Sequence, residues 1–313
     1  MNGKVLITGG HGNLGSWLTK EFCKSGYDVY VLTRSAKTKI PNIQYKLIEA
    51  DVTDYEGLSK KLDLNFDFCI HTASFNEYFL KDYPKKALDI NTLGTRNLLE
   101  ILSKKKIKRF IYFSTFHIYG INSGIVNENS EPSPKNDYAA THLFAEYYIK
   151  QFGATHKVDY TILRLSNSYG APTFLNTDKW YLVLNDLVKS SFEEGKIIIK
   201  SNGEPKRDFV WMNDVTNITK CILENDVNGV YNLSFGKSYK IINLANIVKN
   251  VYEERYKKSI NIEINNNDKT VYNDLIVDNS KLINKINFKM SDMLFVEVNR
   301  IFDLLQKNND LNE

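Results

Sequence analysis

The first residues of the chain place the strongest limit on its fold. An apolar run at residues 4–8 (KVLIT) is followed by the glycine-rich sequence GGHGNLG and by a helical pattern over residues 13–25. Gly9 allows a tight turn, Gly12 lets the backbone approach a pyrophosphate, and Gly15 lets the helix pack against the strand. The helix start offers unpaired N–H groups to an anion. An ordinary turn is the alternative, but the flanking strand and helix favour a dinucleotide-binding unit.

Short β-rich runs and helical patterns alternate along the residues that follow. The expected strands lie at 28–33, 44–49, 66–72, 109–114 and 159–166. The expected helices lie near 13–25, 85–104 and 138–152. Such alternation is typical of a parallel sheet that is covered by helices on both faces and binds ligands at the carboxyl ends of its strands. The sequence therefore predicts an α/β fold, a doubly wound parallel Rossmann sheet.

Composition excludes several other classes of protein. The chain has 313 residues, of which 42% are apolar, so a sizeable core is expected. No run approaches the roughly 18 consecutive apolar residues that span a bilayer, and a net charge of +4 does not indicate nucleic acid. The cysteines are few and widely spaced, which argues against a disulfide framework or a zinc site. We expect a cytoplasmic protein with no metal, membrane or nucleic-acid partner.

Further segments occur in an order that is similar to a known family. They are DVTD at 51–54, IHTA at 70–73, NTLGT at 91–95, STFHIYG at 114–120, LRLSNSYG at 163–170, RDFVWMNDV at 207–215 and VYNL at 230–233. Together they resemble the extended short-chain dehydrogenase/reductase family, the NAD-dependent epimerase/dehydratases, which act mostly on nucleotide-linked sugars. The resemblance is close over about residues 4 to 235 and loose over the remainder.

The resemblance implies two domains with the substrate between them. A cofactor domain would comprise residues 1–170 and 208–234. A second, smaller α/β substrate domain would comprise residues 171–207 and 235–313, and would hold a nucleotide-diphosphate sugar.

The resemblance also implies a homodimer. The helices near 85–104 and 138–152 carry apolar residues beyond those that the sheet needs, including Leu143, Phe144, Tyr147 and Tyr148. In this family such helices pair into the four-helix bundle of a dimer. A third layer within one chain is the alternative.

A set of cofactor-binding residues follows from the family pattern. Asp51 and the Val52 backbone would meet the adenine edge. Ala73 would line the path to the nicotinamide ribose, and Asn91 would lie beneath the cofactor. The whole set is Gly9, Gly12, Asn13, Leu14, Gly15, Thr33, Arg34, Ser35, Asp51, Val52, Ala73, Asn91, Tyr138 and His142.

The choice between NAD and NADP stays open. NAD-selective members place an acid at the end of the second strand, whereas this chain has Thr33, Arg34 and Ser35 there. Arg34 suits the 2′-phosphate of NADP, or it stacks on the adenine of NAD while the two hydroxyls serve the ribose. We expect the cofactor to be NAD or NADP, with tight retention by the protein as one alternative.

The family pattern gives Thr115, Tyr138 and His142 as the catalytic residues. Thr115 would hydrogen-bond the substrate hydroxyl that becomes a carbonyl. Tyr138 would exchange the proton of that hydroxyl as a general base or acid. Asn167 and Arg207 would bind the substrate diphosphate, since the planar arginine fork suits phosphate oxygens. His117 would shape the substrate pocket or act on the substrate.

His142 is a departure from the family, because the family carries Lys four residues after the catalytic Tyr. A cation about 5 Å from a tyrosine, at an effective dielectric constant near 20, stabilises the phenolate by roughly 3 kcal/mol. An imidazole at pH 7 is mostly neutral and does not give that help. It can still hydrogen-bond the ribose. The oxidised nicotinamide would then be the nearest positive charge, so a bias towards oxidation is our hypothesis.

Other absences narrow the reaction class. The family's 4,6-dehydratases follow Ser-Thr with Asp and Glu, and here Phe116 and His117 stand in those places. Members that invert carbons beside a ketone use a Cys where Phe116 stands. Hydride transfer at one carbon, C4 of a nucleotide-linked hexose or heptose, remains.

Oxidation to a 4-keto sugar for bacterial surface polysaccharide is the main reading, on a faint resemblance to 4-dehydrogenases of GDP-linked heptose. A 4-epimerase and a 4-ketosugar reductase are the alternatives. A non-catalytic dinucleotide-binding sensor is a further one, although the intact Thr115 and Tyr138 favour an enzyme.

Overall fold

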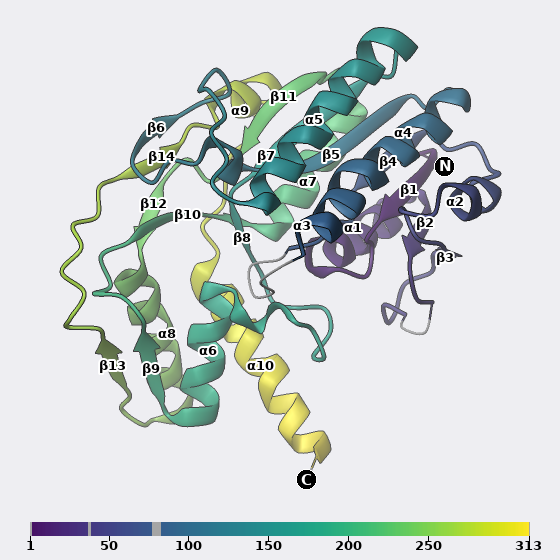
Figure 1. The fold of residues 1–313 in the computed structure, drawn as a ribbon. Coiled ribbons are helices and arrows are strands. Elements are labelled where there is room, and N and C mark those ends of the chain that lie inside the picture. The colour runs from purple at the N-terminus through teal and green to yellow at the C-terminus, as the bar shows by residue number, and fades with distance from the viewer. Residues whose placement is uncertain (1, 37–38, 77–82, 313) are drawn as a thin grey trace.

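A seven-stranded parallel sheet forms the centre of the larger part of the molecule (Figure 1). The structure is a computed structural model that describes residues 2–36, 39–76 and 83–312, with side chains as far as residue 307. The spatial order is β11-β7-β5-β4-β1-β2-β3. The bounds are β1 Lys4–Thr8, β2 Asp28–Thr33, β3 Lys46–Glu49, β4 Phe68–His71, β5 Arg109–Thr115, β7 Tyr160–Leu165 and β11 Gly229–Leu233. The chain reverses direction across the sheet between β1 and β4, where such sheets bind ligands.

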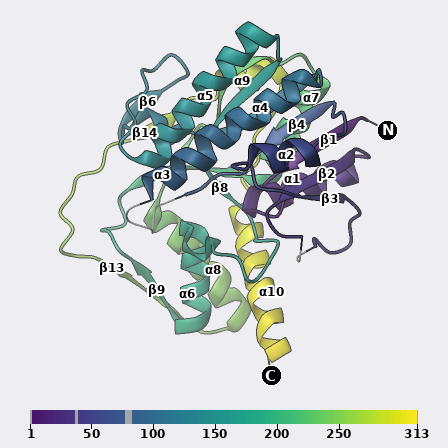
Figure 2. The same ribbon diagram turned by 45° about the vertical axis from the view of Figure 1, so that its right-hand side comes forward.

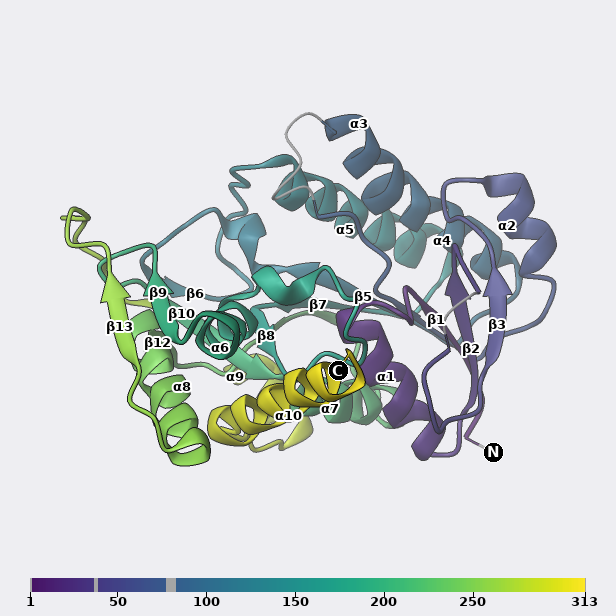
Figure 3. The same cartoon turned by 90° about the horizontal axis from the view of Figure 1, so that it is seen from below.

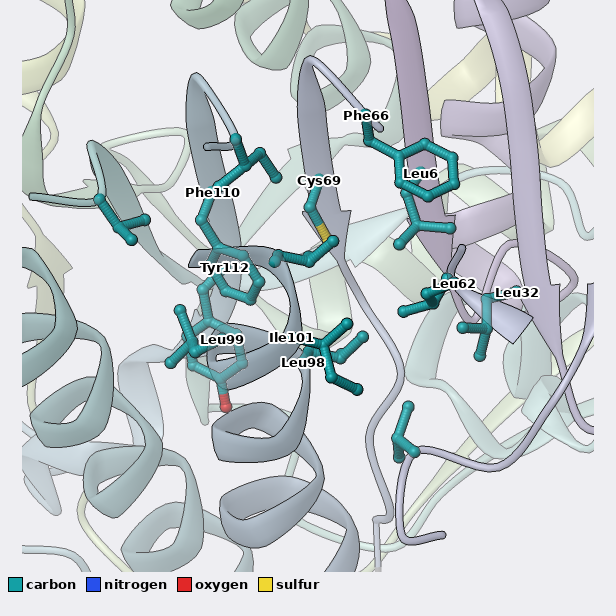
Figure 4. Packing of buried hydrophobic residues seen from close by; sticks show 14 of the residues in the cluster. Leu6, Leu32, Leu62, Phe66, Cys69, Leu98, Leu99, Ile101, Phe110 and Tyr112 are labelled. Carbon is teal, nitrogen blue, oxygen red and sulfur yellow. The ribbon is translucent and has the colours of Figure 1, made fainter. Parts of the chain in front are cut away.

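Helices cover both faces of this sheet because side chains alternate along each strand. On β1, Leu6 packs into one apolar layer, while Val5 and Ile7 pack into the other. The first layer, shown in part in Figure 4, includes side chains of α2 (Tyr55–Lys61), α4 (Gly94–Lys104) and α5 (Asp137–His156). The second includes α1 (Asn13–Lys24) and α7 (Met212–Glu224). This three-layer arrangement, visible from below in Figure 3, confirms the predicted doubly wound fold.

The expected strands and helices agree with the structure to within a few residues, with one correction. The helix predicted over 85–104 is three elements: α3 (Pro84–Ala87), a π-helix at Leu88–Leu93, and α4. A π-turn widens the helix by one residue and is frequent at functional sites. Hydrophobic periodicity does not reveal so short a change of helix type.

The smaller part of the molecule has its own apolar core, and Figure 2 shows the helices of this part below the central sheet. Its helices are α6 (Val183–Glu194), α8 (Ile241–Tyr256) and α10 (Leu294–Asn312). Its strands are β8 Asn167–Tyr169, β9 Lys196–Ile199, β10 Lys206–Trp211, β12 Ser238–Lys240 and β13 Asn261–Ile264, in the order β12-β10-β8 and β13-β9.

The predicted domain boundaries stay a prediction, and two late elements lie against the larger part. Side chains of α9 (Ser280–Ile286) join the apolar layer of α1 and α7. The strand β14 (Leu275–Val277) pairs with β6 (Gly124–Val126). The last third of the chain therefore contributes to both parts.

Candidate functional site at the carboxyl ends of the strands

The glycine-rich turn connects β1 to α1 at the point where the sheet reverses. Gly9 has φ +65°, a conformation that glycine adopts without strain. A Cβ atom at Gly15 would lie 2.1 Å from the Gly9 carbonyl oxygen, and one at Gly9 would lie 2.9 Å from the Ala73 backbone nitrogen. The turn therefore requires glycine at both positions and packs directly against the segment that follows β4.

The start of α1 has the features of an anion site. Its N-terminal residue Gly12 supplies no side-chain cap, and α1 begins at Asn13 with its first N–H groups at the turn. The Asn13 side-chain oxygen is buried and has no hydrogen-bond partner among the described residues. Buried polar atoms are rarely left unpaired, so a bound group that donates a hydrogen bond fits here. These features match the diphosphate and ribose of a dinucleotide.

The residues expected at the adenosine end form two local turns. The Thr33 hydroxyl donates to the Ser35 carbonyl at 3.1 Å, which leaves Arg34 exposed between them. One oxygen of Asp51 accepts hydrogen bonds from the backbone and hydroxyl of Thr53, at 2.9 and 2.8 Å. The next residue, Val52, is buried. Adenine recognition by these residues stays a prediction.

Asn91 lies in the π-helix, and its amide is fully engaged by protein. Its oxygen accepts from the Phe75 N–H at 2.6 Å, and its nitrogen donates to the Phe75 carbonyl and the Thr141 hydroxyl, both at 3.0 Å. The side chain therefore clamps the segment after β4 to α5. We infer that Asn91 supports the cofactor site through this segment.

The structure brings Thr115 and Tyr138 together. Thr115 ends β5 and is 3% exposed, while Tyr138 lies in the first turn of α5, which Asn136 caps by accepting from the Ala139 N–H at 2.8 Å. Burial raises the pKa of Tyr138 to about 12, and a hydrogen bond with Thr115 opposes that rise. The phenol is thus a weak acid here and needs a positive charge nearby to act as a base at neutral pH.

His142 lies one helical turn after Tyr138 and is 1% exposed. The two ring centres are 4.6 Å apart at 69°. Its Nδ1 atom is 2.6 Å from the Tyr112 hydroxyl, and its Nε2 atom is buried without a partner among the described residues. Burial, and then the charge of His117, lower the pKa of His142 to about 3. The imidazole of His142 is therefore neutral at pH 7 and supplies no positive charge to Tyr138.

Two of the expected substrate residues, Asn167 and Arg207, lie on neighbouring strands of the smaller part. Asn167 on β8 donates its amide N–H to the Asp208 carbonyl at 2.9 Å, and Arg207 on the adjacent β10 is exposed. His117 lies in the 3₁₀-helix Phe116–Tyr119, with its ring 6.3 Å from that of Tyr138. Loss of hydration, and then the charge of Arg207, lower the pKa of His117, although its ring keeps contact with solvent.

Two tyrosines near this site were missed from the sequence. Tyr112 contacts His142, and Tyr181, in the 3₁₀-helix Lys179–Tyr181, raises the pKa of Tyr138 through its charge. The Asn76 amide donates to the Tyr181 hydroxyl at 3.5 Å. A signal for Tyr112 did exist. Residues two apart on a strand and residues four apart on a helix are both separated by about 6 Å along the axis, so side chains on a strand and a helix packed against each other can pair at matching intervals. No such rule places Tyr181.

Three other kinds of functional feature are relevant in the described residues: a second surface hollow, a metal-binding group and a membrane-spanning helix. A surface hollow at the amino ends of β1 and β4 is lined by Lys4, Asp67 and Lys108, far from the glycine turn along the strands. Within residues 2–36, 39–76 and 83–312, no three His, Cys, Asp or Glu side chains are grouped to hold a metal ion. No helix in the described part of the chain has both the length and the apolarity to cross a membrane.

Comparison with known proteins gives a consistent family. A putative UDP-glucose 4-epimerase from Methanocaldococcus jannaschii is 30% identical over 251 residues, covering 78% of this chain and 81% of that protein. A dTDP-D-glucose 4,6-dehydratase from Dictyostelium discoideum is 28% identical over 300 residues, covering 83% of this chain and 62% of that protein. The solved structure of UDP-N-acetylglucosamine 4-epimerase from Methanobrevibacter ruminantium M1, in complex with UDP-N-acetylmuramic acid, has a TM-score of 0.83 at 25% identity, covering 97% of this chain and 99% of that one.

The family model itself covers the glycine turn, the Thr115 and Tyr138 pair, and the strand pair that carries Asn167 and Arg207. It matches residues 5–234, which is most of the chain. The resemblance read from the sequence is therefore confirmed, and the chain belongs to the NAD dependent epimerase/dehydratase family.

Proposed function

We propose that this chain transfers a hydride between a nicotinamide cofactor and C4 of a nucleotide-diphosphate sugar, and that its overall reaction is 4-epimerisation. The observation that carries the proposal is the contact between Thr115 and Tyr138 at the carboxyl end of the sheet, beside the glycine turn. The names of the relatives support the choice of epimerisation over the net oxidation favoured on sequence.

The residues have separable roles in this reaction. Thr115 holds the C4 hydroxyl of the sugar, and Tyr138 removes the hydroxyl proton and later returns it. A nicotinamide cofactor, held at the glycine turn, would supply the hydride chemistry at C4 of the sugar. Arg207 and Asn167 hold the diphosphate while the sugar rotates to present its other face. Tyr181 lies where it can contact the sugar.

Dehydration is disfavoured, although one relative is named a 4,6-dehydratase. Phe116 occupies the place of the expected acid, and its ring centre lies 4.3 Å from that of His117 with the rings tilted by 35°. A phenyl ring has no proton to move, so the elimination of water lacks its acid. We propose that the ketone formed at C4 is reduced again or released.

Net oxidation to a 4-keto sugar is the second candidate, and His142 favours it. Because His142 is neutral, the positive charge that helps Tyr138 to lose its proton comes from the oxidised cofactor. In the reductive half of an epimerisation the cofactor starts uncharged, so this help would develop only as the hydride leaves.

A His142→Lys variant tests this idea directly. The ammonium group restores about 3 kcal/mol of phenolate stabilisation, so we expect oxidation of the sugar at pH 7 to be faster by at least tenfold. The measurement is the initial rate of nicotinamide reduction. A His142→Gln variant is the control, because it keeps an N–H donor without a charge. Equal rates in the Lys and native proteins would exclude a weakened base.

The family description names NAD as the cofactor, while the exposed side chain of Arg34 is also compatible with NADP. An exposed guanidinium suits a 2′-phosphate. The mass of the nucleotide released when the purified protein is denatured decides between the two, and its oxidation state shows whether the cofactor is retained between turnovers. A retained cofactor is expected of an epimerase, because the same hydride leaves and returns.

We also propose that the protein is a homodimer that pairs through the π-helix and α5. Leu88, Leu93, Phe144 and Tyr147 are 39%, 40%, 47% and 57% exposed, and no described segment forms a third layer over them. Leu143, grouped with these residues in the sequence argument, is instead buried against Ile118, Tyr119 and Val126. A second copy of the chain buries this apolar face by symmetry.

A doubly substituted chain, Phe144→Glu with Tyr147→Lys, is expected to be monomeric in sedimentation equilibrium, while the native protein has twice the mass of the chain. Charges in the centre of an apolar interface leave it unstable. The control is Val271→Glu, at a residue that is 86% exposed and belongs to neither the π-helix nor α5. A native monomer would contradict the proposal.

A further inference from the structure

Tyr112 and His142 form a closed pair beneath Tyr138. Tyr112 lies on β5, inside the apolar layer shown in Figure 4, and both side chains are 1% exposed. The ring centres are 5.6 Å apart, and the rings are tilted by 34°. Ser114 and Glu146 repeat the contact two strand residues and one helical turn further on, at 2.6 Å. The pair is thus set by the register between β5 and α5, which holds the imidazole in one place.

The direction of the hydrogen bond follows from its length. The separation of 2.6 Å between the Tyr112 oxygen and His142 Nδ1 is short for an N–H donor and ordinary for an O–H donor. The length therefore favours Tyr112 as the donor.

We propose that Tyr112 donates its hydrogen to Nδ1 of His142 and so fixes the hydrogen of the neutral imidazole on Nε2, where it serves as a donor to the ribose of the cofactor. Tyr112 is then a positioning residue. The ribose part rests on the proposed function. His142 keeps the hydrogen-bonding role that Lys has in the family and gives up the charge.

The unpaired Nε2 atom supports this assignment. It is buried and has no partner among the described residues, next to the ring of Tyr138. An N–H at this position needs an acceptor from a bound molecule, and a ribose hydroxyl oxygen is one. With the hydrogen on Nδ1 instead, the Tyr112 hydroxyl would donate to the Thr95 oxygen, and Nε2 would accept a hydrogen bond from a ribose hydroxyl.

The first test is the tautomer of His142, read by ¹⁵N NMR of histidine-labelled protein as purified. A His142→Asn variant assigns the signals. We expect the hydrogen on Nε2 in the native protein and a mixture of the two tautomers in Tyr112→Phe. Tyr30→Phe is the matched control, because Tyr30 lies in the same apolar layer and its hydroxyl accepts from Lys46. A native spectrum with the hydrogen on Nδ1 overturns the proposal, and this result needs no variant to fold.

The second test is affinity for NAD, measured by calorimetry on protein freed of nucleotide. We expect Tyr112→Phe to bind about tenfold more weakly than the native protein and Tyr30→Phe to bind equally well. Equal binding by Tyr112→Phe overturns the ribose role. If the tautomer and affinity behave as stated but no nucleotide-sugar is turned over, the proposed function fails while the role of Tyr112 stands.

Discussion

Replacing Tyr138 by Phe is expected to lower the rate of sugar turnover by about 10³-fold. The proton of the C4 hydroxyl then has no acceptor, and general acid–base catalysis typically contributes a factor of this order. The ring remains, so its packing beside His142 and His117 should persist. The measurement is kcat for hydride transfer under saturating cofactor, together with the dissociation constant for the cofactor.

Unchanged cofactor affinity would place the loss in the chemical step, and loss of turnover is what distinguishes an enzyme from a sensor. We expect Tyr138→Phe to bind the cofactor within about threefold of the native protein, because the phenol acts on the substrate and the glycine turn holds the dinucleotide. Tyr272→Phe, whose hydroxyl contacts Asp268 in a distant loop, controls for loss of a tyrosine hydroxyl. Equal turnover by the native and Tyr138→Phe proteins would show that Tyr138 does not transfer the proton.

Replacing Glu146 by Gln is expected to reduce the free energy of unfolding by about 3–5 kcal/mol, because it leaves Arg164 charged and unpaired in the interior. Glu146 on α5 is fully buried, and Arg164 on β7 is 3% exposed. Arg164 donates to both carboxylate oxygens, at 3.1 and 2.8 Å, and Ser114 donates to one of them at 2.6 Å. The three groups tie α5 to β5 and β7.

The prediction has a matched surface control. Asp303→Asn breaks the exposed pair that Asp303 forms with Arg255 at 2.6 Å, and such pairs contribute about 1 kcal/mol or less. Urea unfolding of both variants gives the comparison. A second variant, Glu146→Met with Arg164→Leu, should recover most of the stability, because no charge is then left buried. A loss below about 1 kcal/mol in Glu146→Gln would show that the pair is not structural.

The order of strands and helices could be predicted because the signals are local. The glycine turn demands close backbone approach, and the structure shows the crowding that excludes a side chain at Gly9 and Gly15. Thr115 and Tyr138 could be placed together because motif spacing fixes the end of β5 and the start of α5. The family then supplied roles that composition and periodicity do not carry.

The remainder of the site depends on contacts between distant parts of the chain. The place of Asn91 beneath the cofactor stays a prediction. Its hydrogen bonds to Phe75 and Thr141 depend on the π-helix, which no hydrophobic periodicity reveals. Tyr181 reaches the site through the packing of the smaller part. Tyr112 followed a register rule that becomes usable only when β5 and α5 are known to be neighbours.

The most direct test of C4 chemistry uses nucleotide-diphosphate hexoses that carry deuterium at C3, C4 or C5. Each is incubated with the native protein and NAD, and the rate and product are followed by absorbance and NMR. The proposal predicts slower turnover with the C4-labelled sugar alone, and an epimer at C4 as the product. An isotope effect at C3 or C5, or no turnover of any sugar by protein that binds NAD, would contradict it.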